Sequence, residues 1–507
     1  MEFQSILGVN KFKFVKPEDI VMPRYFYDLN LDQIVRDIMD HQKVYDLEKY
    51  YYIRSEPEDI RYRMEVMKDM DLDGVLHCII DYSIRMRKSK EFLNNISESV
   101  MEEQKQKWKL DAAHQYITAV KILHSELEKE ALQSRGMKAF FEWLKEYMLT
   151  DGFIQLEKDT EQLISHFNAM SFNFQIKRDR IIINQGYLED DYCKQLLDIF
   201  KQQTDTEHFY QNNPFGTIVL SALEGALLEV LKKPYAQTFQ ELKVYDGKYK
   251  DFRNEILLEF ESEVQFYVAF RGYRDEMKEM NFHFCYPKVG EKEFRIIDGY
   301  DLALARKNAV KKKEVIFNDC KFEPGEQFLI ITGPNQGGKT TYARALGQIL
   351  YFGTLGLMVP AQTACFPIFD NIYTHFATDE SMETGAGKLK EELIRLKDMM
   401  GRATKNSFVI INEIFTSATS YDAYIMGKRV IDYFMEADCL GVYVTHIYEL
   451  TKEDNRIVSM VASLLSEDSN IRTFKIERKK ADGRSYANTI VEKYHMTYEE
   501  IKERIRQ

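Results

Sequence analysis

A glycine-rich stretch between an apolar run and a helical pattern constrains the fold of this chain more than any other feature. The apolar run Phe328–Ile331 predicts a buried strand, and the pattern from Thr341 to Leu346 predicts a helix. Between them the sequence reads Gly333-Pro334-Asn335-Gln336-Gly337-Gly338-Lys339-Thr340. Strand, glycine-rich loop and helix in this order are the setting of a phosphate-binding loop. Glycines let backbone N–H groups turn toward an anion, and the helix N-terminus adds partial positive charge.

Two side chains at the end of this stretch suit a nucleoside triphosphate. The Lys339 ammonium can reach the β- and γ-phosphates, and the Thr340 hydroxyl can ligate Mg²⁺. The alternative is a glycine-rich turn that binds nothing. We expect ATP and Mg²⁺ as ligands, with nucleotide contacts from Gly333, Pro334, Asn335, Gln336, Gly337, Gly338, Lys339, Thr340 and Thr341.

Two later apolar runs end in polar residues that fit the same chemistry. Ser407–Ile411 is followed by Asn412 and Glu413, and Gly441–Val444 is followed by Thr445 and His446. At such a strand end, a P-loop ATPase places a carboxylate that holds a Mg²⁺-bound water and an acidic residue that orients or deprotonates the attacking water. Asn412 has the first position without the charge, Glu413 fits the second, and His446 can contact the γ-phosphate or the water. The alternative is that these are ordinary polar strand ends and a structural histidine.

Composition limits the class of protein. The 507 residues are enough for two to four domains, and no apolar run is long enough to span a membrane. The six cysteines are scattered without a CxxC pair, which indicates reduced thiols in a cytoplasmic protein without a zinc site or disulfide framework. A net charge of −12 argues against a uniformly basic coat but allows a local basic face.

The composition and the hydrophobic periodicity of the chain change near residue 290. Before it, sparse glycine and proline and long helical periodicities predict a mainly helical region. The residues 170–185 alternate in a way that predicts a β-hairpin. From about 291 onward, short apolar strands alternate with helices, which predicts an α/β domain with a largely parallel sheet. The clearest helical periodicities are Ser97–Glu130, Gly136–Leu149 and Asp251–Met280.

Several motifs together resemble those of a known family, the MutS proteins, which are DNA mismatch-recognition ATPases. Their order and spacing agree over roughly residues 300–500. Weaker similarity covers the family's segment that enters the clamp and the lever helix that returns from it. The ATPase motifs are Phe328–Tyr342, Val359–Gln362, Ile411–Asp422 and Val444–Leu450, and the weaker matches are Asn184–Asp190 and Glu255–Pro287.

The resemblance implies an architecture and a function. It implies an α/β P-loop (ABC-type) ATPase domain at 291–507, preceded by a mainly α-helical lever and clamp region at 1–290, with the clamp at about 187–255. It also implies slow ATP hydrolysis, an ATP-dependent homodimer in which both subunits contact each nucleotide, and mismatched, branched or distorted double-stranded DNA as ligand. By the same alignment Val315, Ile316 and Ile476 contact the base, and Gly385, Gly387 and Lys388 contact the partner's nucleotide.

The sequence also departs from the family. About 300 residues precede the ATPase motifs, which leaves no room for the mismatch-reading domain. Thr384–Lys388 lacks the hydroxyl expected in the segment that reaches the partner's nucleotide, and Asn412 replaces an aspartate. The chain stops at Gln507, so we expect the C-terminal dimer-locking helices to be reduced or absent.

Two basic clusters are the candidate DNA contacts. They are Arg85, Arg87 and Lys88, and Lys177, Arg178 and Arg180. Such clusters are also common on solvated helix and turn faces. Two other functions therefore stay open: a nucleotide-gated protein-interaction scaffold that does not bind DNA, and a pseudo-ATPase that binds ATP with negligible hydrolysis.

Overall fold

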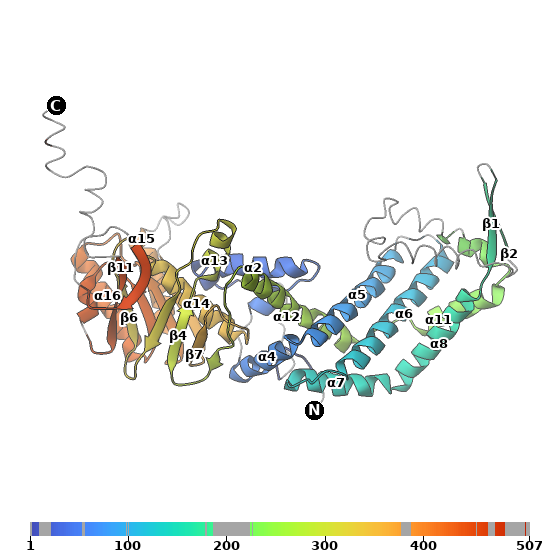
Figure 1. The fold of residues 1–507 in the computed structure, drawn as a ribbon, viewed down its shortest axis with the longest axis horizontal. Coiled ribbons are helices and arrows are strands. Elements are labelled where there is room, and N and C mark those ends of the chain that lie inside the picture. Colours follow the sequence, from blue (N-terminus) through green and yellow to red (C-terminus); the bar gives the residue numbers. More distant parts are fainter. Residues whose placement is uncertain are drawn as a thin grey trace. The chain divides into compact units, whose positions relative to one another are not determined.

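The chain is mixed α/β and forms two compact units (Figure 1). The computed structural model describes residues 3–9, 22–52, 56–97, 99, 101–177, 180–185, 224–225, 227–376, 387–452, 454–464, 472–481 and 502. Unit 1 consists of Met1–Phe3, Asp71–Gln133 and Met137–Glu261, and unit 2 consists of Gln4–Met70, Ser134–Gly136 and Ser262–Gln507. This division differs from the single boundary expected near residue 290, because residues 4–70 pack with the C-terminal half. Most of the expected clamp, residues 186–223, lies outside the described residues.

Unit 1 is built mainly from long helices. The three helical periodicities singled out in the sequence are confirmed as α6, α7 and α12, although α7 and α12 each cross between the units. In α8 the Thr150 hydroxyl accepts a hydrogen bond from the Phe153 N–H at 3.3 Å, which caps the helix. The helices are α5 (Asp73–Asn95), α6 (Glu102–Leu127), α7 (Arg135–Met148), α8 (Asp151–Asn168), α11 (Ala236–Lys248) and α12 (Glu255–Glu279).

Helix packing and a hairpin complete unit 1. The rings of Phe140 and Phe260 stack with centroids 3.6 Å apart, and the Ser89 hydroxyl of α5 donates to the Ala112 carbonyl of α6 at 2.7 Å. The predicted hairpin is confirmed: β1 (Phe172–Lys177) and β2 (Arg180–Gln185) pair antiparallel. None of the helices in the described part of the chain is both long and apolar enough to cross a membrane.

Unit 2 contains two sheets and the helices around them. The helices are α1 (Tyr25–Asp28), α2 (Leu31–Met39), η2 (Asp40–Gln42), α3 (Glu48–Tyr51), α4 (Pro57–Met70), α13 (Leu302–Val310), α14 (Lys339–Thr354), α15 (Lys388–Arg402), α16 (Ser420–Glu436) and η3 (Tyr448–Lys452). The strands are β3 (Lys288–Val289), β4 (Phe294–Gly299), β5 (Asn318–Phe322), β6 (Phe328–Thr332), β7 (Thr363–Phe366), β8 (Asn371–Phe376), β9 (Ser407–Asn412), β10 (Leu440–Val444), β11 (Ile457–Leu464) and β12 (Arg472–Arg478).

The larger sheet of unit 2 places three strand ends side by side. It is six-stranded, in the order β12-β11-β6-β10-β9-β8, and only β12 runs antiparallel to its neighbour. The expected strands β6, β9 and β10 and the largely parallel sheet are confirmed. Because β6, β10 and β9 are parallel neighbours, the residues that follow them meet at one edge of the sheet. The smaller sheet has the order β3-β7-β4-β5.

Helices cover both faces of the larger sheet, which explains why its central strands β6, β10 and β9 are mainly apolar runs. On β9, Val409 and Ile411 belong to a core cluster that also contains Leu396 of α15 and Phe434 of α16. Ile410 faces the other way, toward α14: a Cβ built on Gly347 would lie 2.9 Å from its Cδ1 atom.

Residues 28–29 of unit 2 dock on α14, the helix that follows the glycine-rich loop. Arg344 Nε donates to the Asp28 carbonyl at 2.9 Å, and Gln348 Nε2 donates to the Leu29 carbonyl at 2.8 Å. The contact is close, because a Cβ on Gly347 would lie 2.5 Å from a Leu29 methyl carbon. The N-terminal segment is therefore part of the packing that holds α14 in place.

Candidate functional site

The glycine-rich loop, residues 333–338, joins β6 to α14 in a conformation that needs its glycines. Gly333 has a φ of 120° and Gly338, the N-cap of α14, has a φ of 90°. A Cβ on Gly333 would lie 3.0 Å from the Cβ and backbone nitrogen of Ala462 on β11. Only glycine fits this position without strain or displacement of β11. The first N–H groups of α14 have no partner within the helix and can bind an anion.

Lys339 is the buried cation of this loop. It is 4% exposed, and its Nζ donates to the carbonyls of Gly333 at 3.1 Å and Pro334 at 3.0 Å. Burial lowers the pKa of Lys339, the Glu413 charge opposes that shift, and the Arg472 charge adds to it. Phosphate oxygens would replace the neutral carbonyls with negatively charged acceptors, which bind an ammonium group more strongly. The loop therefore fits a polyphosphate.

Thr340 and Asn412 form the candidate metal-binding pair. The Thr340 hydroxyl donates to Asn412 Oδ1 at 2.9 Å, which joins the start of α14 to the end of β9. Both oxygens are of the hard, neutral kind that Mg²⁺ accepts. Among the described residues, no group of three or more His, Cys, Asp or Glu side chains could hold a metal ion. A Mg²⁺ ion at this pair would therefore depend on the ligand's phosphates for negative charge.

Glu413 and His446 face each other across the same edge. His446 Nε2 lies 3.1 Å from Glu413 Oε1, and the Glu413 N–H donates to the Val444 carbonyl at 2.9 Å. The hydrogen bond from His446 lowers the pKa of Glu413, burial opposes the shift, and the Lys339 charge adds a smaller lowering. Glu413 is therefore a carboxylate at neutral pH, able to accept a proton from a water. Its backbone is left-handed, with a φ of 52°.

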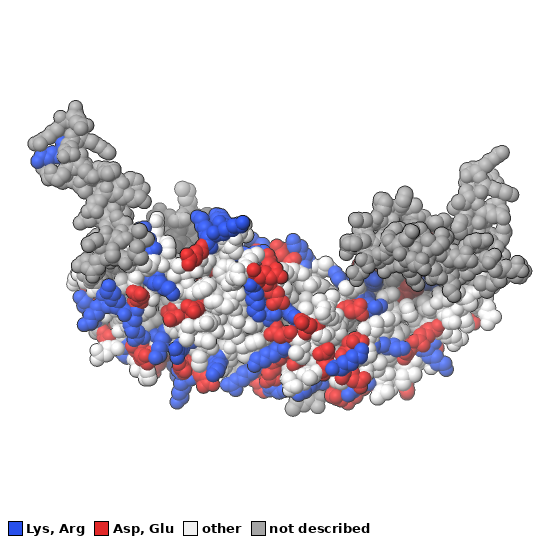
Figure 2. Space-filling view, viewed as in Figure 1, with Lys and Arg blue, Asp and Glu red and all other residues white. Residues whose placement is uncertain are grey.

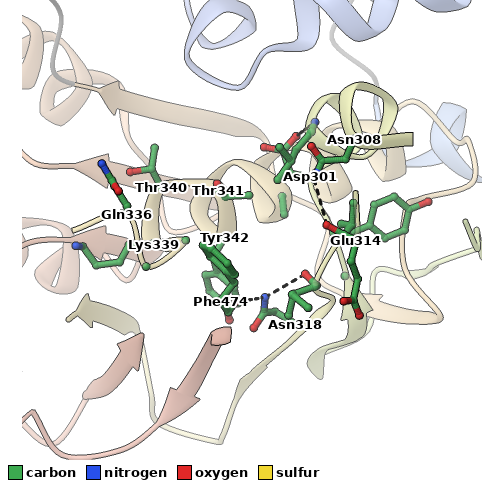
Figure 3. Close-up of a pocket in the computed structure, with 18 of the residues that line it drawn as sticks. Asp301, Asn308, Glu314, Asn318, Gln336, Lys339, Thr340, Thr341, Tyr342 and Phe474 are labelled. Carbon is green, nitrogen blue, oxygen red and sulfur yellow. Dashed lines mark hydrogen bonds between the residues drawn. The ribbon is translucent and has the colours of Figure 1, made fainter. Parts of the chain in front are cut away.

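A cavity of about 840 Å³ brings most of the expected nucleotide contacts together (Figure 3). It is lined by the loop and the start of α14, by Glu413, and by Val315 and Ile316. The expected nucleotide, metal and catalytic residues that are not in its lining are Gly333, Pro334, Asn412, His446 and Ile476. This volume exceeds that of a single small anion and suits a drug-sized ligand.

Phe474 takes the place in the lining that the sequence assigned to Ile476. Ile476 is buried, and its N–H donates to Asn318 Oδ1 at 2.8 Å. Asn318 also donates to the Phe474 carbonyl at 3.1 Å (Figure 3). Residues two apart share a face of a regular strand, but Phe474 has a φ of 57°, which breaks that alternation. The signal that could have found it is an aromatic residue two positions from the aligned one.

The residues expected to reach a partner's nucleotide lie around the start of α15. Gly387 is the exposed N-cap of that helix and Lys388 is its first residue. Gly385 lies outside the described residues. The contact between subunits stays a prediction.

The candidate DNA contacts lie in unit 1, whereas the cavity residues lie in unit 2. Arg85, Arg87 and Lys88 are on α5, and Arg85 Nε pairs with Asp81 at 2.9 Å. Lys177 and Arg180 are the last pair of the hairpin, and Arg178 lies outside the described residues. On the face drawn in Figure 2, acidic and basic side chains are interspersed. The DNA contacts stay predictions.

Comparison with known proteins relates this site to a family. Residues 329–503, which contain the loop after β6 and the ends of β9 and β10, match the model of MutS domain V. The DNA mismatch repair protein MutS of Bacillus pumilus is 28% identical over 255 residues, which are 50% of this chain and 27% of that protein. The chain is a partial, divergent member of the MutS family.

Two further relatives show how much of the chain the similarity covers. The DNA mismatch repair protein MutS of Bacillus subtilis is 30% identical over 180 residues, which are 35% of this chain and 20% of that protein. The one from Fervidobacterium nodosum is 25% identical over 306 residues, 56% of this chain and 35% of that protein. The chain thus aligns with 20% to 35% of the length of these MutS relatives.

Proposed function

We propose that this chain binds ATP with Mg²⁺ in the cavity after β6 and hydrolyses it slowly, as a P-loop (ABC-type) ATPase. One observation carries the proposal: a buried lysine, a hydroxyl–amide pair and a carboxylate–imidazole pair lie together at the carboxyl edge of three parallel strands. Sequence-distant residues are brought together there by the sheet, as Lys339, Asn412 and His446 illustrate. Glycine-rich turns that bind nothing have no need of such an arrangement.

Different residues of the chain have different roles in the proposed phosphoryl transfer. The loop N–H groups and Lys339 bind and orient the phosphates, and Mg²⁺, when bound, neutralises their charge. Thr340 and Asn412 are the residues that would hold the metal and its water. Glu413 accepts a proton from the attacking water or orients it, and the hydrogen bond with His446 keeps the carboxylate aimed. Hydrolysis is slow because the Asn412 amide supplies no charge where a carboxylate would bind the metal's hydration shell more strongly.

The same cavity would also hold the base, against apolar side chains of its wall. Val315 and Ile316 line one part of the wall and Phe474 another. Aliphatic and aromatic surfaces bury a planar base, and the aromatic ring adds stacking.

The proposal extends to DNA at the family level. The relatives carry the name DNA mismatch repair protein. We propose that ATP binding makes two copies of this chain dimerise, and that the homodimer closes on mismatched, branched or distorted duplex DNA. Each ATP would be contacted by Gly385, Gly387 and Lys388 of the other copy. The basic residues Arg85, Arg87, Lys88, Lys177, Arg178 and Arg180 would contact the phosphate backbone.

A second function has three features of the chain's charges in its favour. Arg85 is already paired with Asp81, and charges of both signs alternate on the face drawn in Figure 2, while the net charge is −12. On the face drawn in Figure 2, these features differ from the clustered basic patch that marks a DNA-binding surface. A nucleotide-gated scaffold for protein partners is therefore the rival.

A fluorescence-anisotropy titration separates the two functions. Homoduplex, mismatched and four-way-junction DNA are titrated with the wild-type chain, with and without ATP, at several salt concentrations. We expect ATP-dependent binding that weakens as salt rises, because neutralised phosphates release counterions. No binding to any of these DNAs at low salt would reject the clamp and favour the scaffold.

Light scattering tests the dimer. Glu413→Gln should bind ATP without hydrolysing it and should therefore hold the ATP-bound state. We expect a dimer with ATP and a monomer without it, and the Lys339→Ala variant as matched control should stay monomeric. A Glu413→Gln monomer at saturating ATP would reject ATP-driven dimerisation.

A further inference from the structure

Glu392, a residue that no motif singled out, is bonded to the segment that carries Glu413. It lies on α15 and is 5% exposed. One of its carboxylate oxygens accepts a hydrogen bond from the Phe415 N–H at 3.0 Å. This bond joins α15 to the turn that follows β9.

The turn from Glu413 to Phe415 needs such support. Both residues have left-handed backbone, with φ values of 52° and 62°, and neither is glycine. Residues other than glycine keep a left-handed backbone only where contacts with the surrounding structure hold them in it. The Glu413 N–H is held by the Val444 carbonyl on one side, and the Phe415 N–H is held by Glu392 on the other.

Helix α15 is itself anchored to the sheet close to Glu392. Arg395, one turn after Glu392, donates to the Thr374 carbonyl on β8 at 2.8 Å and pairs with Asp28. Leu396 packs in the same core cluster as Phe415. Because β8 is the neighbour of β9, these contacts fix the Glu392 carboxylate relative to the strand that ends at Asn412.

We propose that Glu392 is a positioning residue for hydrolysis, which holds Glu413 in the direction that faces Lys339 and His446. The inference rests on the proposed ATPase function. Without the carboxylate, the buried Phe415 N–H loses a charge-assisted bond. The turn then relaxes toward right-handed backbone, and the Glu413 carboxylate swings away from the cavity while the glycine-rich loop keeps its shape. Glu392 therefore affects turnover and leaves nucleotide binding nearly untouched.

Steady-state ATPase and ATP-binding measurements on three variants test the role. Glu392→Ala removes the acceptor, and we expect kcat to fall about 10–100-fold, since a misaimed base loses part of the acid–base contribution. The dissociation constant for ATP should change less than about threefold. Glu392→Gln should restore most of the turnover, because its amide oxygen still accepts from the Phe415 N–H. Asp398→Ala removes an exposed carboxylate from the same helix, which pairs with Arg402, and should match the wild type.

A double variant separates positioning from a merely structural role. Single-turnover measurements at high enzyme concentration can detect the residual rate that Glu413→Gln keeps when its steady-state turnover is lost. If Glu392 acts through Glu413, then adding Glu392→Ala to Glu413→Gln should lower that residual rate no further. Where Glu392→Ala proves too unstable to purify, Glu392→Asp has the same charge and is too short to reach the Phe415 N–H, and it should show the same loss of kcat. A wild-type chain that hydrolyses no ATP would reject the proposed function itself. A folded Glu392→Ala or Glu392→Asp chain with wild-type kcat would reject the positioning role alone.

Discussion

Backbone strain distinguishes the two units. Every non-glycine residue with a positive φ in the described part of the chain belongs to unit 2, and none belongs to unit 1. Gln336, Glu413 and Phe474 are among them and line the cavity. Each left-handed residue costs roughly 1–3 kcal/mol, so such residues persist only where the surroundings hold them.

Unit 1 is held together mainly by contacts between regular helices. Its helices are joined by aromatic stacking, as with Phe140 and Phe260, and by partly buried ion pairs such as Lys109 with Asp246 at 2.8 Å. The difference teaches that the site is a place where unit 2 maintains a costly conformation, whereas the basic residues of α5 sit on regular helix. The predictions below test that contrast, beginning with the largest effect.

Removal of the buried cation should have the largest effect. Lys339→Ala takes away the charge aimed at the phosphates in a partly desolvated site, a loss on the order of 2–4 kcal/mol, or roughly 30- to 1,000-fold in affinity. Mant-ATP fluorescence measures it, with Lys390→Ala on α15 as a surface-lysine control. Wild-type affinity in Lys339→Ala would remove the basis for the phosphate-binding loop.

Acid should weaken unit 2 through His375 on β8. Burial lowers the pKa of His375 to about 4, and the charges of Arg395 and Arg24 add to the lowering. The folded state therefore takes up the proton at a lower pH than the unfolded state does. The free energy of unfolding should stay constant above about pH 6.5 and fall by up to about 3 kcal/mol as pH drops toward 4.

Urea unfolding across this pH range measures the effect. His375→Gln, which cannot take up the proton, should lose less stability between pH 6.5 and 4 than the wild type. Equal slopes in the two proteins would show that His375 is not the group responsible.

Phe474 and Ile476 should separate base binding from packing. Phe474→Ala removes a ring from the cavity wall, and we expect ATP affinity to fall by about 1 kcal/mol, roughly fivefold, with inorganic triphosphate unaffected. Ile476→Ala, which removes buried side-chain atoms outside the lining, should lower the melting temperature instead. Mant-ATP binding and thermal unfolding of both variants decide it, and the reverse pattern would restore Ile476 as the base contact.

Asn412→Asp should raise turnover severalfold and lower the Mg²⁺ concentration at half-maximal rate. A carboxylate binds the metal's hydration shell through charge-assisted hydrogen bonds, roughly twice as strong as neutral ones. ATPase rates across a Mg²⁺ titration measure both quantities, and Asn406→Asp at the other end of β9 is the control. If rate and Mg²⁺ midpoint stay as in the wild type, Asn412 merely ends the strand.

The smallest effect belongs to unit 1. Lys88→Ala should weaken DNA binding about two- to threefold and reduce the salt slope by about one, as expected for one lost phosphate contact. Arg85→Ala should do less, because Arg85 already pairs with Asp81. Anisotropy at several salt concentrations compares them. A loss of DNA affinity larger than tenfold for either variant would show that α5 carries a preformed DNA-binding site.

Local patterns predicted what depends on neighbours in sequence. Apolar runs gave β6, β9 and β10, alternation gave the β1–β2 hairpin, and the glycines marked the turn before α14. The approach of Glu413 to His446 also follows, because parallel neighbouring strands end at one edge.

Long-range packing and local irregularities were not predictable in the same way. The packing of residues 4–70 with the C-terminal half depends on contacts such as that of Leu29 with α14, which leave no periodic signal. The alignment assigned the base contact to Ile476, and it carries no information on the left-handed residue at Phe474, which breaks the alternation of the strand. Glu392 escaped notice because its partner is a backbone N–H, and sequence gives no sign of which backbone group a carboxylate will meet.

The tight contact of Leu29 with Gly347 decides where a working fragment can begin. A truncation starting at residue 291 would keep all the expected nucleotide contacts but would lose the segment whose carbonyls accept from Arg344 and Gln348. It would also expose the apolar surface beside Gly347 that the Leu29 side chain covers. Expression trials that aim at a soluble, nucleotide-competent fragment should therefore retain Asp28 and Leu29 with the residues around them, or supply this segment as a separate peptide.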